Sequence, residues 1–152
     1  MVMSNQLKFN FFRILVFFLA INCFSSCNTT KKIDTSTSFP EWIQGEWVSY
    51  GLQLNTTETW SIYLNVNQTS AAIQYPSLDC GGNWTIEKQE QNTITLIETI
   101  TKGTDKCTNK GKVIITKVDA NHISFSYFSP FNNRLEAFST LISKDLVDLW
   151  NN

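Results

Sequence analysis

The feature that most constrains the fold of this chain is an alternation of apolar and polar residues that recurs from Trp42 onward. Successive side chains of a β-strand point to opposite faces, so a period of two is typical of half-buried strands. β-branched and aromatic residues dominate these segments, as they do on pleated surfaces. The clearest run places four apolar residues on one face: Trp60, Ile62, Leu64 and Val66. The pattern therefore predicts an all-β domain.

Turn-forming residues divide the alternating region into about eight expected strands. Their expected ranges are 45–51, 58–66, 70–75, 82–88, 92–101, 111–118, 121–129 and 134–142. The links are short, which favours an antiparallel up-and-down meander, and eight such strands can close into a barrel without exposed edges. Short helical turns are expected only near residues 39–43 and in the tail at 145–150. We therefore expect an eight-stranded antiparallel up-and-down barrel.

The first 26 residues have the composition of a targeting segment. Lys8 and Arg13 supply positive charge, and residues 14–21 form an uninterrupted apolar run. That run is far shorter than the ~20 residues of a membrane-spanning helix, and its length suits a signal peptide. The polar, low-complexity residues that follow are typical of a flexible tether. The sequence therefore predicts a signal peptide at 1–26, a tether at 27–39 and one domain at 40–152.

Residues 24–27, Phe-Ser-Ser-Cys, resemble the lipobox of bacterial lipoproteins. In that family two small residues precede a cysteine that receives acyl chains, such as palmitate, and becomes the new N-terminus. The resemblance implies cleavage before Cys27 and a lipid anchor on its thiol. It also implies a place in the bacterial cell envelope, on the periplasmic or cell-surface face of a membrane. The alternatives are an ordinary signal peptide cut elsewhere, or acylation at Cys23.

Two cysteines, Cys80 and Cys107, remain once Cys23 leaves with the signal and Cys27 carries lipid. Export implies an oxidising compartment, where such a pair forms a disulfide. A zinc site would need four ligands, and His122 is the only histidine in the chain. The sequence therefore predicts a Cys80–Cys107 disulfide, no metal site and no cofactor.

The tripeptide Gly45-Glu46-Trp47 follows the expected turn at 39–43 and resembles the Gly-x-Trp motif of lipocalins and their calycin relatives. In those barrels the tryptophan closes one end of the core. The resemblance covers about residues 40–143 and implies a lipocalin-like barrel with Trp47 buried at one end. Many members also stack a late arginine on this tryptophan. Arg134 is the only arginine of the mature chain and lies beside an expected turn, so that feature is not evident here.

Glu98 is the most informative single candidate. It shares a strand face with Ile94, Leu96 and Ile100, so strict alternation directs its carboxylate into the barrel. A buried carboxylate must be paired or have its pKa raised, which makes Glu98 a candidate for binding a ligand. We favour the alternative from sequence alone, in which Glu98 lies at the barrel mouth beyond the core or a bulge turns it outward.

Aromatic residues on the inward faces could surround a ligand near Glu98. The candidates are Trp60, Trp84 and Tyr127, with Phe125 beside them. A small eight-stranded barrel can hold one small ligand or be filled by its own side chains, and core packing is the simpler explanation for these rings. His122 follows a turn, and we expect it at the surface.

The remaining features exclude several functions. The formal net charge is −1, which provides no basic surface for nucleic acid, and no phosphate-binding, dinucleotide or catalytic motif is present. We expect a non-enzymatic, membrane-anchored module that binds a small amphipathic or cationic molecule, or a protein. The alternatives are a structural envelope lipoprotein with a solid barrel, or an inhibitor of a protein that acts through the loop at 76–82. An enzyme ranks last.

Overall fold

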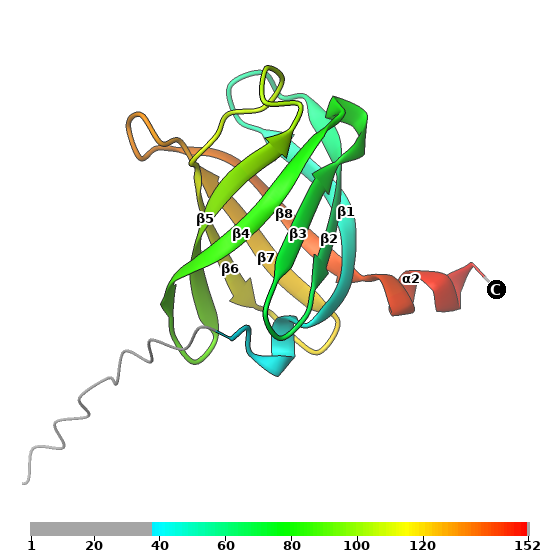
Figure 1. Cartoon of the computed structure of the whole chain (residues 1–152). Coiled ribbons are helices and arrows are strands. Elements are labelled where there is room, and N and C mark those ends of the chain that lie inside the picture. The colour runs from blue at the N-terminus through cyan, green and yellow to red at the C-terminus, as the bar shows by residue number, and fades with distance from the viewer. Residues whose placement is uncertain (1–37, 152) are drawn as a thin grey trace, which may run out of the picture. The chain divides into compact units, whose positions relative to one another are not determined.

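The computed structural model describes residues 38–151, which form a closed eight-stranded barrel (Figure 1). Each strand pairs antiparallel with its neighbours in sequence, and the first strand closes the barrel against the last. The strands are β1 (Gly45–Gln53), β2 (Thr59–Val66), β3 (Ala71–Tyr75), β4 (Cys80–Gln89), β5 (Thr93–Lys102), β6 (Lys112–Lys117), β7 (His122–Phe128) and β8 (Leu135–Ser143). The predicted up-and-down barrel is confirmed, with every expected boundary within two residues of the observed one.

Within residues 38–151, three short helical segments accompany the strands. Two were expected, namely the 3₁₀ turn η2 (Glu41–Ile43) and the C-terminal helix α2 (Lys144–Trp150). The third, η3 (Pro76–Leu78), lies in the link between β3 and β4 and was not expected. Proline at its first position fixes a backbone angle that suits a helical start. No helix within residues 38–151 is long and apolar enough to cross a membrane.

The barrel has two ends that differ in how they are covered. The closed end carries η2 and the β2–β3, β4–β5 and β6–β7 links, and the described chain enters here, because the Phe39 N–H donates to the Gln68 carbonyl. The open end carries the β1–β2, β3–β4, β5–β6 and β7–β8 links. Each open-end link holds one non-glycine residue with positive φ: Thr57, Asp79, Lys110 and Asn133. Such residues are uncommon, so the open-end links have defined conformations.

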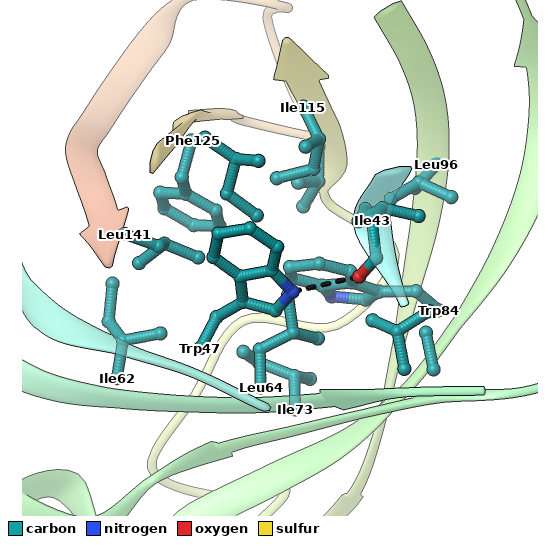
Figure 2. Packing of buried hydrophobic residues seen from close by; sticks show 14 of the residues in the cluster. Ile43, Trp47, Ile62, Leu64, Ile73, Trp84, Leu96, Ile115, Phe125 and Leu141 are labelled. Carbon is teal, nitrogen blue, oxygen red and sulfur yellow. Dashed lines mark hydrogen bonds between the residues drawn. The ribbon is translucent and has the colours of Figure 1, made fainter. Parts of the chain in front are cut away.

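Trp47 seals the core at the closed end. Its side chain is 3% exposed, and its indole Nε1 donates to the Ile43 carbonyl of η2 at 2.8 Å. Figure 2 shows the ring surrounded by apolar side chains from several strands: Ile62, Leu64, Ile73, Leu96, Ile115, Phe125 and Leu141. The expected burial of Trp47 at one end of the barrel is therefore confirmed.

A disulfide joins Cys80 to Cys107, as predicted. It ties the long β5–β6 link at the open end to the first residue of β4. The same link is tightened locally by the N–H groups of Lys106 and Cys107, which both donate to the Gly103 carbonyl. The sequence prediction of cleavage and acylation at Cys27, together with the rival Cys23, lies outside the described residues.

Arg134 has no contact with Trp47. It is exposed and precedes β8 at the open end, whereas Trp47 lies next to η2 at the closed end. The arginine that many lipocalins place over their conserved tryptophan therefore has no counterpart here.

Candidate functional site

A cavity of about 160 Å³ lies inside the barrel at its open end. A volume of this size accommodates a molecule about as large as benzene. Residues of six strands and two links line it: Gln53, Trp60, Tyr75, Leu78, Glu98, Lys106, Cys107, Thr108, Phe125, Tyr127, Glu136 and Ala137. A second hollow, near Gly81 and Gly82, has no buried ionisable group in its lining. The first cavity is therefore the better candidate site.

Glu98 lies at the inner part of this cavity and is only 2% exposed. Its Oε1 accepts two hydrogen bonds, from the Tyr75 hydroxyl at 2.6 Å and from Trp84 Nε1 at 3.0 Å. The interpretation that we favoured from sequence, a solvent-exposed Glu98, was wrong. The pairing of β5 continues past this residue, because the Glu98 N–H donates to the Gly111 carbonyl and its own carbonyl accepts from Lys110. The strand therefore keeps its alternation, and the side chain points inward.

Burial and hydrogen bonding act on the pKa of Glu98 in opposite directions. Desolvation raises the pKa, and the hydrogen bonds from Trp84 and Tyr75 lower it, with a net rise. The pKa of Tyr75 is raised well above its ordinary value, first by burial and then by the neighbouring Glu98 charge. The pKa of Tyr127 is also raised, by burial and by the charges of Glu98 and Glu136. Both phenols therefore stay protonated and act as hydrogen-bond donors.

Two polar atoms beside the cavity lack a partner among the described residues. The Oε2 atom of Glu98 accepts no hydrogen bond, since Tyr75 and Trp84 both donate to Oε1. Trp60 Nε1 is buried and has no acceptor, and Trp60 also lines the cavity. A buried polar group left unsatisfied costs ~1 to 3 kcal/mol, so an acceptor on a ligand would satisfy the Trp60 indole N–H.

The four residues proposed from sequence converge on this region but differ in position. Trp60, Glu98 and Tyr127 line the cavity. Trp84 lies behind it, where its indole donates to Glu98 and stacks on Phe125 with ring centres 6.0 Å apart. Trp84 therefore fixes the carboxylate, while Trp60 and Tyr127 form walls that a ligand would contact.

Two glycines make room for these aromatic walls. A Cβ atom on Gly51 would lie 2.7 Å from the Trp60 ring, and one on Gly111 would lie 2.2 Å from the Tyr127 ring. Any larger residue would therefore have to displace the ring. Sequence reasoning missed both glycines, because a glycine within or beside a strand carries no sign of the ring that packs on it.

Tyr75 was also missed as a site residue. The sequence did contain a signal for its inward position, because Tyr75 alternates with Ala71 and Ile73 on one strand face. All three side chains are buried. The residue ends β3 immediately before Pro76, where sequence reasoning expected a turn. Its hydroxyl reaches Glu98, 23 positions later in the chain.

Some charged residues of the open end form ion pairs and others do not. Asp79 pairs with Lys102 and Lys106, each at 2.7 Å, and these two ammonium groups lower the pKa of Asp79 to about 2. Lys106 lines the cavity and shares the single carboxylate of Asp79 with Lys102. Glu136 lines the cavity with no ion pair to a described residue.

His122 does not belong to the site. It lies at the start of β7 near the closed end, partly exposed, with Nδ1 2.9 Å from an oxygen of Asp119. The described part of the chain contains no group of three or more histidine, cysteine, aspartate or glutamate residues that could hold a metal ion.

No protein-family model, no curated protein and no solved structure matches this chain.

Proposed function

We propose that this chain is a lipid-anchored protein of the bacterial cell envelope that binds a small molecule in its open-end cavity without catalysing a reaction. The observation that carries the binding function is Glu98, a carboxylate buried to 98% beside an interior cavity, with one oxygen held by two donors and the other without a partner among the described residues. A ligand that donates to Oε2 would complete its hydrogen bonding.

The alternative of a solid structural barrel accounts less well for this arrangement. Burial of a carboxylate is costly unless it is paired, and an apolar residue of similar size would pack the same space without that cost. The other half of the barrel is packed in that way, around Trp47. Glu98, the one buried charged residue among those described, lines the cavity.

The proposed anchor is compatible with an accessible cavity. Phe39 joins the closed end through its hydrogen bond to Gln68. Residues 28–38 would span at most roughly 35 to 40 Å when extended. An anchor at Cys27 would therefore be joined to the barrel through Phe39, at the end opposite the cavity.

The anchor is tested by the variant Cys27→Ser. Wild-type protein is expected in the detergent phase, with a mass that includes acyl chains, because two or more chains hold a protein stably on a membrane. The variant should lose the acyl mass. A mature wild-type protein that starts at another residue and carries no lipid would contradict this part of the proposal.

The binding function is tested by native mass spectrometry of full-length protein, purified in detergent from its own cells. We expect a retained small molecule. Ala137 lines the cavity and is buried, so Ala137→Leu should fill the cavity and remove that molecule. Ala120→Leu makes the same change at an exposed position in the β6–β7 link and should leave it bound. Equal occupancy in the two variants would exclude the cavity as the site.

A further inference from the structure

The chemistry of the cavity specifies a charge for its ligand. We propose that the ligand is a small organic cation, in which an ammonium or amidinium group donates to Glu98 Oε2 and an attached apolar group lies among the aromatic walls. This inference rests on the proposed function and adds the chemical class of the ligand.

The first observation is the one-sided hydrogen bonding of Glu98. Both protein donors reach Oε1, at 2.6 and 3.0 Å, so the protein holds the carboxylate in place and leaves Oε2 to a ligand. A carboxylate accepts its strongest hydrogen bonds from cationic N–H groups. An anionic ligand would instead place a second negative charge beside a buried one, which is unfavourable where water is excluded.

The second observation is the balance of charge around the cavity. Glu98 and Glu136 both line it, whereas Lys106 is the only cationic lining residue and binds Asp79 at 2.7 Å, a carboxylate that it shares with Lys102. The two carboxylates act together on one neighbour, because both raise the pKa of Tyr127. The interior of the open end therefore attracts positive charge.

The third observation is the identity of the walls. Trp60, Phe125 and Tyr127 line the cavity together with Glu98. The faces of aromatic rings attract cations, and the attraction is stronger where the pair is desolvated. A flat apolar group also suits a cavity of about 160 Å³.

The test compares three probes of nearly equal size by isothermal titration of the full-length protein in detergent, with protein-free micelles as the blank. The probes are benzylammonium, benzyl alcohol and benzoate, which differ in charge. We expect benzylammonium to bind at least tenfold more tightly than benzyl alcohol, and benzoate not to bind. Equal affinities for the cation and the alcohol, or no binding of the cation, would overturn the proposal.

Two variants assign the preference to a residue. Glu98→Gln keeps the size of the side chain and an oxygen for Tyr75 and Trp84, so it should reduce the preference for the cation to less than twofold. Glu87→Gln removes a carboxylate from an exposed position of β4 and should leave the preference unchanged. A preference that survives in Glu98→Gln would also contradict the proposal.

Failure of the cation proposal is distinguishable from failure of the binding function. If Ala137→Leu releases a retained molecule but the three probes bind alike, the small-molecule function stands and the ligand is not selected by charge. If Ala137→Leu releases nothing and no probe binds, both proposals are wrong. The comparison of the three probes on wild-type protein needs no variant, so it remains decisive even if Glu98→Gln does not fold.

Discussion

The interior of the barrel is filled by different kinds of side chain at its two ends. At the closed end, Trp47 fills the interior among apolar side chains, and its one polar side-chain atom donates to the Ile43 carbonyl. At the open end, Glu98 occupies the interior, with two donors on one oxygen and a cavity beside the other. Both ends belong to one continuous sheet.

The difference shows that strand pairing alone does not decide whether a barrel is filled. The backbone is hydrogen-bonded all around the sheet, so the inward residues are free to differ in size and polarity from one end to the other. Large apolar residues at one end provide stability, and a polar cluster at the other end leaves a space that a ligand can use. Each of the following predictions tests this division of roles.

The largest effect is expected from Trp47→Ala at the closed end. Removing a fully buried aromatic side chain leaves a cavity in the core, and we expect a loss of ~3 to 5 kcal/mol in the free energy of unfolding. Tyr127→Ala at the open end should cost less, because its ring already borders a cavity and is only partly buried. Urea unfolding followed by circular dichroism measures both. Equal losses would mean that the two ends contribute alike to stability.

The disulfide is expected to stabilise the open end almost as strongly. Removal of the Cys80–Cys107 link, which spans 27 positions, should lower the free energy of unfolding by roughly 3 to 4 kcal/mol in the chain-entropy account. The double variant Cys80→Ser, Cys107→Ser tests this by thermal unfolding. Hydrogen exchange should rise in the β5–β6 link and stay unchanged in the β2–β3 link at the closed end. Uniform loss of protection at both ends would contradict a local role.

A smaller and pH-dependent effect is expected from Glu98→Gln. Folding raises the pKa of Glu98 above its ordinary value of 4.5, so the folded state holds this proton more tightly than the unfolded state. The resulting stabilisation is fully present below the unfolded pKa and is lost as the pH rises through the folded pKa. Relative to wild type, the variant should therefore gain stability as the pH increases from 4 to 8.

Chemical denaturation at several pH values checks that expectation, with Glu87→Gln as the matched control. Glu87 is exposed, so its substitution controls for the loss of a carboxylate outside the barrel interior. A Glu98→Gln variant that loses stability relative to wild type as the pH increases would show that the two hydrogen bonds outweigh the cost of burial.

The smallest effect is expected from Asp79→Asn, at the outer edge of the open end. The ion pairs of Asp79 with Lys102 and Lys106 are exposed, and such pairs contribute little to stability. The melting temperature should be nearly unchanged. Carbon-detected NMR titration of the wild type should nevertheless place the Asp79 midpoint at about 2, because both lysines favour the carboxylate. A large drop in melting temperature would mean that these charges, as well as the disulfide, hold the open end.

Much of the fold could be predicted from the sequence because its signals are local. The alternation of residues such as Trp60, Ile62 and Leu64 marks strands directly, and short links between strands leave little choice but antiparallel neighbours. Pairing of Cys80 with Cys107 followed from counting, since the other two cysteines lie near the N-terminus. The candidate ligand residues were also proposed from local pattern, because alternation places each of them on the inward face of its strand.

The partners of Glu98 could not be predicted in this way. Tyr75 and Trp84 precede it by 23 and 14 positions and lie on two other strands. Whether they reach the same oxygen depends on the register between β3, β4 and β5, which includes two irregularities in the pairing of β4. A shift of one residue in any of these pairings would turn a side chain to the opposite face of the sheet.

The sequence by itself determined the eight strands, their order and the disulfide, because each of these depends on residue patterns along the chain, and the resemblance to lipocalins implied the burial of Trp47. Only the tertiary structure decided that Glu98 is buried, that two donors hold one of its oxygens, and that Gly51 and Gly111 make room for the rings beside it. The physical reason is closure of the barrel. Closure brings inward residues from distant strands into one small volume. There the side chains must pack together, and their polar and charged groups must find partners.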